Sequence, residues 1–557
     1  MIDDLYQRQR RQLTATTMFN WPGLQGWSFY FIGKALLAWF GSLNLLGLWN
    51  AAFIAALVVP LPYQWLRVLR QLLALPLAAA LLYRESHLPP ISRLLAQWEQ
   101  VSQFSWNYLL ELTTRLVSFE LLALIMVAWI VYLYVRRVLR MTVVAVVLLS
   151  ISVWWQQPAP GIQPLLPAAT STQPLAPLGV SAPTPDSANP DTMLAEFYRT
   201  QSRVLERPEA AVLADTGLDI DIVMINICSM SWQDLETYNL ANHPFLRRQD
   251  IIFNQYTSGS SYSGPAALRL LRANCGHVPH EQLFSAANNQ CYLTESLAEL
   301  GYSSQLVLNH TGEFDNFKSL LAEHGGFAGL PVRVADSAPQ IMTGFDDTPI
   351  YDDLSILQNL LEENVRSATE PRFSFYNTVT LHDGNRLIAG ENGLPANANN
   401  SARNYPQRLE KLLNDLNTFY DDVKASGRPT LIVIAPEHGS GLQGDAMQLP
   451  GVREIPTPAL TQVPIMMRLI APELQRLGST PVLVSEPVGT TAISASIYEI
   501  LGQRPVRNKQ LDVAAVVQGL PQQPYVAEND SVTVMERELQ LWLKIEEQDW
   551  IVYPTTR

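Results

Sequence analysis

Leu431-Ile-Val-Ile-Ala-Pro-Glu437-His438-Gly439 is an apolar run that ends in a proline, an acid, an imidazole and a glycine. An uninterrupted apolar run of this length, bounded by turn residues, predicts a buried strand. A second apolar run, Ile220-Asp-Ile-Val-Met-Ile-Asn-Ile227, ends in the same way at Cys228. Ligand sites of α/β proteins form at the carboxyl ends of strands. The thiol, the acid and the imidazole therefore predict one metal centre of a hydrolase or transferase.

The last two thirds of the chain alternate between strand-like and helix-like segments. This alternation predicts an α/β domain with a mostly parallel sheet and helices on both faces. The strand-like runs lie near residues 219–227, 250–256, 304–309, 373–379, 430–435 and 463–470. The helical segments lie near residues 264–273, 292–300, 315–324, 353–366, 403–426 and 488–502. Short extra strands are predicted between about 525 and 553, and no function is assigned to them.

The N-terminal part holds most of the apolar excess of a chain that is 48% hydrophobic. Five apolar spans are predicted, near residues 28–46, 49–64, 68–83, 118–135 and 141–155. Several are shorter than the ~20 residues that a membrane helix prefers. A buried helical bundle is the alternative, but such helices need a polar face, which these runs lack. The pattern therefore favours an α-helical transmembrane domain with five spans.

The basic residues predict how these spans are oriented. With five spans, three basic clusters fall on one side of the membrane, and that side is then the cytoplasm. The N-terminus is inside, and everything after residue 156 is outside. Segment 88–117 is predicted to be an amphipathic piece at the outer membrane interface. The three clusters are Arg8, Arg10 and Arg11; Arg67 and Arg70; and Arg136, Arg137 and Arg140.

A stretch rich in proline separates the apolar part from the α/β part. Between Gln156 and Pro190, prolines recur among Ala, Ser and Thr, and this composition predicts an extended, semi-rigid spacer. We therefore expect a transmembrane domain over residues 1–156, a linker over 157–195 and a catalytic domain over 196–557. The net charge of -13 and the lack of a basic stripe argue against binding of nucleic acid.

All three cysteines lie beyond the linker, at Cys228, Cys275 and Cys291. In an oxidising compartment an odd number of cysteines leaves one unpaired. Cys275 and Cys291 flank a loop rich in His, Asn and Gln, which favours a disulfide between them. Cys228 is then the free thiol. It is either a small buried hydrophobic residue or, given its place at a strand end, a metal ligand.

A polar turn leads into a helix at Ser261-Tyr-Ser263-Gly-Pro265. Ser263 occupies the predicted cap, and Pro265 occupies the first turn, where proline is favoured. An ordinary capping serine is one interpretation. The other is a nucleophile: the free N–H groups at a helix start bind phosphate or sulfate, and a metal activates the hydroxyl. These residues alone leave both interpretations open.

Two histidines follow strand-like runs. His382 lies in Leu381-His-Asp-Gly-Asn385, and His310 lies in Leu308-Asn-His310-Thr-Gly. Each is either a structural histidine that is held by hydrogen bonds or a functional group that faces a crevice.

Four motifs occur in order: Asn226-Ile-Cys228-Ser, Ser261-Tyr-Ser263-Gly-Pro-Ala, Leu381-His-Asp-Gly-Asn385 and Pro436-Glu-His-Gly439. Together they resemble the alkaline-phosphatase/sulfatase superfamily and, within it, the bacterial cellulose phosphoethanolamine transferase family, BcsG. The resemblance covers nearly the whole chain, including the five spans, the linker and one extracytoplasmic domain.

The resemblance implies a metal site with one zinc ion. The wider superfamily usually has carboxylates in place of Cys228 and Glu437 and often binds two metals, so a single ion is the expectation here. The implied zinc ligands are Cys228, Ser263, Glu437 and His438. The implied catalytic residues are Ser263 as nucleophile, with Tyr262, His382 and Arg453 as accessory groups.

The resemblance also implies a reaction and a location. Phosphoethanolamine would pass from phosphatidylethanolamine to Ser263, and then to a glucose hydroxyl of nascent cellulose. His382 would serve as acid in one half and as base in the other. The implied location is the bacterial inner membrane, with several spans and a periplasmic catalytic domain. The implied partners are inner-membrane cellulose synthase subunits, in a pathway that builds biofilm cellulose.

Two other functions remain open. One is a metal-dependent phosphodiesterase or sulfatase that passes its group to water. The other is a non-catalytic membrane scaffold for cellulose synthase subunits that keeps a relic metal site. The motifs do not separate water from sugar as the acceptor.

Overall fold

The computed structural model describes residues 23–40, 43–86, 102–116, 119–155, 189–205, 220–367, 370–388, 401–546 and 548–554. The chain divides into two compact units. The helical unit comprises Met1–Trp98 with Leu116–Ala182, and the α/β unit comprises Glu99–Arg115 with Pro183–Arg557. The boundary between Ala182 and Pro183 falls inside the predicted linker, and residues 99–115 belong to the α/β unit.

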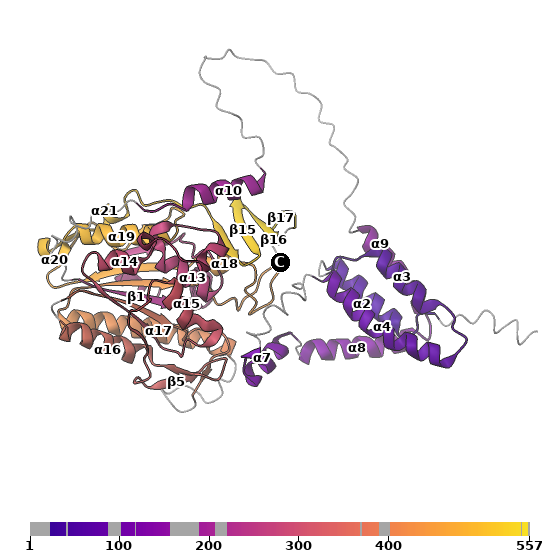
Figure 1. Cartoon of the computed structure of the whole chain (residues 1–557). Coiled ribbons are helices and arrows are strands. Elements are labelled where there is room, and N and C mark those ends of the chain that lie inside the picture. The colour runs from indigo at the N-terminus through magenta and orange to yellow at the C-terminus, as the bar shows by residue number, and fades with distance from the viewer. Residues whose placement is uncertain are drawn as a thin grey trace, which may run out of the picture. The chain divides into compact units, whose positions relative to one another are not determined.

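Among the described residues of the helical unit, five helices lie where the five apolar spans were predicted (Figure 1). In the part of the chain that the structure describes, α4 is the one helix long and apolar enough to cross a membrane. Helices α3 and α9 and the segment Leu122–Val135 of α8 are shorter apolar helices. The bounds are α2 Trp27–Trp39, α3 Gly47–Val58, α4 Gln64–Glu85, α8 Phe119–Val135 and α9 Met141–Trp155.

A buried ion pair, which the apolar pattern did not predict, lies inside the helical unit. Lys34 of α2 pairs with Glu85 at the end of α4, and their side chains are 1% and 0% exposed. Asn50 of α3 accepts a hydrogen bond from Lys34 Nζ at 2.6 Å and donates one to the Glu85 carboxylate. Buried charges are tolerated when they are paired and hydrogen-bonded. This cluster therefore fixes how the three helices pack.

We expect Lys34→Met to destabilise the helical unit by about 3–5 kcal/mol, because Glu85 is left as an unpaired buried charge. The double replacement Lys34→Met with Glu85→Leu should recover most of that loss, because it removes both charges. Thermal unfolding of the full chain in detergent measures both. A single variant as stable as the double variant would contradict the expectation.

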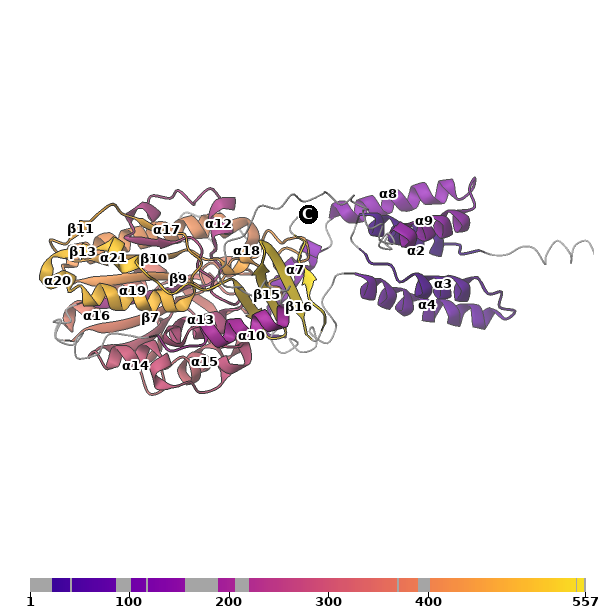
Figure 2. The same cartoon turned by 90° about the horizontal axis from the view of Figure 1, so that it is seen from above.

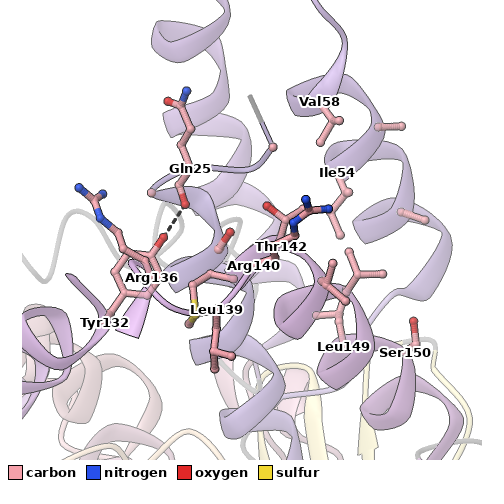
Figure 3. Close-up of a pocket in the computed structure, with 18 of the residues that line it drawn as sticks. Gln25, Ile54, Val58, Tyr132, Arg136, Leu139, Arg140, Thr142, Leu149 and Ser150 are labelled. Atoms are coloured by element: carbon pink, nitrogen blue, oxygen red, sulfur yellow. Dashed lines mark hydrogen bonds between the residues drawn. The ribbon is translucent and has the colours of Figure 1, made fainter. Parts of the chain in front are cut away.

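An open pocket of about 1650 Å³ lies in the same unit (Figure 3). It is lined by residues of α2, α3, α8 and α9, among them Ile54 and Leu149, and by Arg140 of the loop between α8 and α9. Tyr132 Oη donates a hydrogen bond to Gln25 O beside it, at 2.6 Å. None of the predicted metal ligands lines this pocket, so it is separate from the predicted site.

An eight-stranded sheet forms the centre of the α/β unit, in the order β12-β2-β10-β9-β1-β7-β3-β4. Strand β10 runs antiparallel to β9 and β2, and the other neighbouring pairs are parallel. The predicted mostly parallel sheet is therefore confirmed. The strands are β1 Asp221–Ile227, β2 Ile251–Phe253, β3 Ser303–Leu308, β4 Val332–Val334, β7 Arg372–Thr378, β9 Thr430–Pro436, β10 Ile465–Ile470 and β12 Val482–Val484.

Helices cover both faces of this sheet (Figures 1 and 2). Alternate residues of β1 enter different cores: Ile222 and Met224 on one face, Val223 and Ile225 on the other. Burial on both faces explains why the strand is apolar without alternation. The first face carries α13 Ser263–Leu271, α14 Leu293–Ala298, α15 Phe317–His324 and α19 Thr490–Gly502. The second carries α12 Trp232–Thr237, α16 Asp353–Arg366 and α17 Ser401–Ser426.

Smaller elements complete the unit. The predicted tail strands are present as an antiparallel sheet of β14 Val526–Asn529, β15 Val532–Arg537, β16 Gln540–Ile545 and β17 Ile551–Val552. Two small sheets consist of β5 Gln340–Thr343, β6 Pro349–Tyr351 and β8 Arg386–Leu387, and of β11 Gln475–Leu477 and β13 Gln510–Asp512. The short helices are α18 Pro458–Thr461, α20 Pro505–Asn508 and α21 Val513–Val517.

Two helices differ from the sequence expectation. Helix α10, Pro190–Gln201, begins inside the predicted linker, most of which lies outside the described residues. The Asn189 side chain caps it, and Pro190 is its first residue, where proline fits. Helix α7, Trp106–Leu116, forms within segment 88–117, whose first part lies outside the described residues. It contacts the α/β unit, where Ser105 N donates a hydrogen bond to Phe345 O.

Candidate metal centre

Strand register brings the predicted ligands to one edge of the sheet. Ile227 of β1 pairs with Pro436 of β9, so Cys228 and Glu437 follow at the same level on neighbouring strands. Parallel strands present their carboxyl ends together, which makes this edge the usual place for a site. The apolar runs of the sequence therefore place the thiol and the carboxylate side by side.

The four predicted ligands converge at this edge. Cys228 Sγ lies 3.5 Å from Ser263 Oγ and 3.7 Å from His438 Nε2. His438 Nε2 lies 3.2 Å from Ser263 Oγ and 3.9 Å from Glu437 Oε2. Ligand atoms of Cys228, Glu437 and His438 all lie within 4.8 Å of one another, and the three residues are buried.

Ser263 is placed as the second interpretation of its motif requires. Tyr262, with extended backbone, is the N-cap of α13, and no side chain caps the helix there. Ser263 is the first helical residue, and its hydroxyl is directed to Cys228 and His438. The interpretation of Ser263 as an ordinary capping serine is therefore wrong, because its oxygen contacts the cluster instead of the helix backbone.

The residues present fit a metal ion. Tetrahedral zinc with sulfur at ~2.3 Å and nitrogen or oxygen at ~2.0 Å separates its ligand atoms by about 3.3–3.6 Å, close to the distances in this cluster. Glu437 Oε2 is buried and accepts no hydrogen bond, as expected for an oxygen atom that binds a cation. His438 Nδ1 lies 2.8 Å from Gly439 O, so a proton on Nδ1 leaves the lone pair of Nε2 free for a metal. Thiolate, imidazole and carboxylate together suit zinc.

Burial shifts the pKa values of these groups. It raises the pKa of the Cys228 thiol to about 11, with a further contribution from the Glu437 charge. It raises the pKa of Glu437 to about 7. Burial and the Arg453 charge hold the pKa of His438 well below its usual range, so its imidazole is neutral. A bound cation would reverse the shifts of the two acids, because it favours their charged forms.

These pKa values predict a pH-dependent metal affinity. Binding must expel the Cys228 proton at any pH below about 11, and below about 7 it must also expel a proton from Glu437. We therefore expect the affinity to rise about tenfold per pH unit between pH 7 and 8, and more steeply between pH 5 and 7. Competition with a chelator of known affinity measures this. A flat profile would contradict the assignment of Cys228 as a ligand.

Arg453 lies between two imidazoles. Its Nη1 is 3.1 Å from both ring nitrogens of His438, and its Nη2 is 3.4 Å from His382 Nε2. His382 Nδ1 donates to Asp383 O at 2.6 Å, which leaves Nε2 facing the guanidinium. Burial and the Arg453 charge lower the pKa of His382 to about 3, so His382 is neutral. A guanidinium held next to neutral rings offers a site for anionic oxygens.

The loop that carries Ser263 and the loop that carries Arg453 are tied together by two residues. Tyr262 Oη donates a hydrogen bond to Glu454 Oε2 at 2.8 Å, and Glu454 directly follows Arg453. Asn529, in the tail strand β14, accepts from Ser261 N and donates to the carbonyl oxygens of Arg453 and Glu454. Asn529 could not be predicted from the sequence, because an Asn in a tail strand belongs to no periodic pattern or motif.

His310 takes part in the support of the cluster. His310 Nε2 donates to Asn377 Oδ1 at 2.8 Å, and Asn377 Nδ2 donates to Glu437 Oε1 at 2.6 Å. Gly312 N donates to His310 Nδ1, which fixes this tautomer. Asn377 also donates to Asn226, so the carboxyl ends of β1, β7 and β9 are linked. Sequence analysis missed Asn377; its place at a strand end was the one available signal.

The predicted disulfide is present. Cys275 and Cys291 are joined with an S–S distance of 2.07 Å, and Cys228 is the free, buried cysteine. The bridge closes a loop between α13 and α14, away from the four-residue cluster.

The sheet and the buried cluster at its carboxyl edge define the class: an α/β protein with a mostly parallel sheet and a candidate metal centre at the carboxyl ends of its strands. Models of the BcsG C-terminal and N-terminal domains match residues 177–550 and 27–154. The "Cellulose biosynthesis protein BcsG" of Escherichia coli K12 is 34% identical, with 96% of this chain and 97% of that protein covered. The Salmonella typhimurium protein of the same name is 33% identical at the same coverage. The chain belongs to the BcsG family of cellulose biosynthesis proteins.

Solved structures show more distant likenesses. An alkaline phosphatase superfamily protein from Vibrio parahaemolyticus has a TM-score of 0.44 and 13% identity, with 66% of this chain and 88% of that one covered. The C-terminal periplasmic domain of EcEptC from Escherichia coli has a TM-score of 0.40 and 13% identity, with 64% and 98% covered.

Proposed function

We propose that this protein transfers phosphoethanolamine from phosphatidylethanolamine to glucose hydroxyls of nascent cellulose, through an intermediate on Ser263. The observation that carries the proposal is the convergence of the Ser263 hydroxyl with a thiol, a carboxylate and an imidazole, beside a guanidinium. Membership of a family named for cellulose biosynthesis supports the acceptor. The phosphoethanolamine donor rests on the resemblance of the motifs.

The metal would be a single zinc ion held by the cluster. Its ligands would be Cys228, Ser263, Glu437 and His438. Zinc at this position would supply Lewis-acid stabilisation of negative charge on the serine and phosphoryl oxygens.

In the first half of the reaction, Ser263 Oγ forms a bond to phosphorus and the bond from phosphorus to the diacylglycerol oxygen breaks. The serine loses a proton, and the departing diacylglycerol oxygen gains one. We assign His382 Nε2 to these transfers, because Nδ1 is committed to the Asp383 carbonyl oxygen. With a pKa of about 3, the imidazole starts as a proton acceptor and becomes a strong acid once it is protonated.

In the second half, the glucose hydroxyl oxygen bonds to phosphorus and the bond between phosphorus and Ser263 breaks. The neutral His382 accepts the proton of the sugar hydroxyl, and the serine oxygen regains a proton. Arg453 donates hydrogen bonds to the phosphoryl oxygens in both halves. Tyr262 supports this role by donating a hydrogen bond to Glu454, the residue after Arg453, whose carbonyl oxygen accepts from Asn529.

The N-terminal helices would place this chemistry at a membrane. We propose five spans in the bacterial inner membrane and a periplasmic α/β unit. The lipid donor is then in the same membrane, and cellulose reaches the acceptor site from inner-membrane synthase subunits. The apolar helices at all five predicted positions support this arrangement, and α4 supports it by both length and composition.

A donor assay with and without sugar tests the proposal. The full chain in nanodiscs is incubated with a chromogenic ethanolamine-phosphate ester, with and without a cello-oligosaccharide. The proposal expects faster release with the sugar, and phosphoethanolamine on the sugar by mass spectrometry. Strong turnover that is indifferent to the sugar would instead assign a hydrolase. No turnover with any donor would favour the scaffold function.

A further inference from the structure

A segment between two apolar helices forms part of the wall around His382. Residues 102–115, here named the α7 strap, precede α8 in the helical unit, yet their contacts place them in the α/β unit. Ser105 and Tyr108 of the strap are both 7% exposed. Their burial means that this face of the strap packs against other residues of the α/β unit.

The strap reaches the His382 loop through a stack of rings. Phe345 lies against the imidazole of His382, with ring centroids 4.2 Å apart and planes at 25°. Phe104 and Tyr108 pack on Phe345 at 5.7 and 6.0 Å, and Ser105 N donates to the Phe345 carbonyl oxygen at 2.9 Å. Phe345 is therefore held between the strap and the imidazole.

The strap also contacts the His382 loop directly through Tyr108 and indirectly through Glu111 and Ser401. Tyr108 Oη donates to Asp383 Oδ2 at 3.2 Å, on the residue next to His382. Glu111 Oε1 accepts from Ser401 N at 3.1 Å, and Ser401 Oγ accepts from Gly384 N at 2.7 Å. The fit is close: a Cβ on Gly384 would meet Tyr108 Cδ2 at 2.7 Å.

We propose that the α7 strap positions His382 for the reaction, so that the site is completed by a segment that precedes α8 in the chain but packs within the α/β unit. Tyr108, Glu111 and Phe345 are positioning residues that act through His382. Tyr108 and Glu111 lie three residues apart in α7, so one face of this helix makes both of their contacts. A fragment that starts after the linker lacks these contacts. The kinetic arm of the test rests on the proposed function.

The test uses the full chain in nanodiscs that contain phosphatidylethanolamine. Tyr108→Phe removes the hydroxyl and keeps the ring, and Glu111→Ala removes the contact to Ser401. Each should lower kcat about tenfold, since small displacements of a reacting group are costly, while KM for the donor and the zinc content stay unchanged. Glu111→Gln should restore the rate, because its amide oxygen still accepts from Ser401 N. Asn107→Ala, on the exposed face of α7, is the matched control.

Hydrogen exchange gives a readout that needs no turnover. Tyr108→Ala should speed amide exchange in Leu381–Asn385, whereas Asn107→Ala should not. Wild-type kcat together with unchanged exchange in the Tyr108 and Glu111 variants would overturn the proposal, as would an equal effect of Asn107→Ala. If the wild-type chain turns over no donor, the proposed function fails and the exchange result alone decides the role of the strap.

Discussion

Ser263→Ala is expected to lower phosphoethanolamine transfer at least about 10³-fold, because loss of the nucleophile in a covalent mechanism removes nearly all of the chemistry. The folded state should be nearly unaffected, since Ser263 makes no capping hydrogen bond to the helix backbone. The measurement is transfer from phosphatidylethanolamine in nanodiscs to a cello-oligosaccharide, followed by mass spectrometry. The same method should detect a phosphoethanolamine adduct on wild-type Ser263 when the acceptor is omitted.

Ser285→Ala provides the control, because Ser285 is an exposed serine on the same unit. It should transfer at the wild-type rate. A Ser263→Ala protein that keeps more than a tenth of the wild-type transfer activity would contradict the assignment of Ser263 as the nucleophile. In cells, the Ser263→Ala protein should be stably present while modified cellulose is lost. If modified cellulose persists, this chain does not transfer phosphoethanolamine.

Cys228→Ala is expected to lower zinc affinity by at least about 100-fold, because even outer-shell changes cost 10–100-fold and this change removes a ligand. The wild-type chain should hold about one zinc ion, measured by elemental analysis after equilibration with a chelator. Thermal stability of the variant should no longer rise when zinc is added, since stabilisation by a ligand requires binding. The site geometry predicts this effect directly, because Cys228 Sγ lies within 3.7 Å of two other candidate ligand atoms.

The double variant Cys275→Ser with Cys291→Ser is the control, because it removes two cysteines that are not predicted zinc ligands. It should lose about 2–5 kcal/mol of stability, the usual cost of removing a native disulfide, and still bind one zinc ion. Two tightly bound ions in the wild-type chain, or one full equivalent in Cys228→Ala, would refute the single site. Together the two variants separate loss of a ligand from loss of a cross-link.

Much of the fold could be predicted because its signals are local. Strands β1 and β9 are apolar on both faces, so their runs are visible in the sequence, and Cys228 and Glu437 follow at their ends. The helices of both units have apolar patterns that are long enough to predict a helix from the sequence. The short strands β4, β5, β6, β8, β11, β12 and β13 were missed, because runs of two to four residues carry little periodicity.

The support of the site was less predictable. Asn377 and Asn529 each hydrogen-bond to several groups that lie far away in the sequence, and no local pattern predicts such partners. The buried Lys34–Glu85 pair joins residues on separate helices, and each residue alone is an ordinary interruption of an apolar run. The α7 segment was expected at a membrane interface from its amphipathic pattern, but the pattern does not say which surface an apolar face will contact.

The sequence by itself determined the strands, their carboxyl-terminal chemistry, the apolar helices and the disulfide partners, because hydrophobic periodicity and residue chemistry are properties of short segments. Tertiary structure alone decided that the Ser263 oxygen leaves its helix backbone for the thiol and the imidazole, and that Arg453 lies between His438 and His382. It also decided that the α7 strap closes on the His382 loop. The physical reason is that several of these contacts join segments more than a hundred residues apart in the sequence. Which of them meet is selected by burial, hydrogen bonding and chain connection in the whole fold, and not by any short segment.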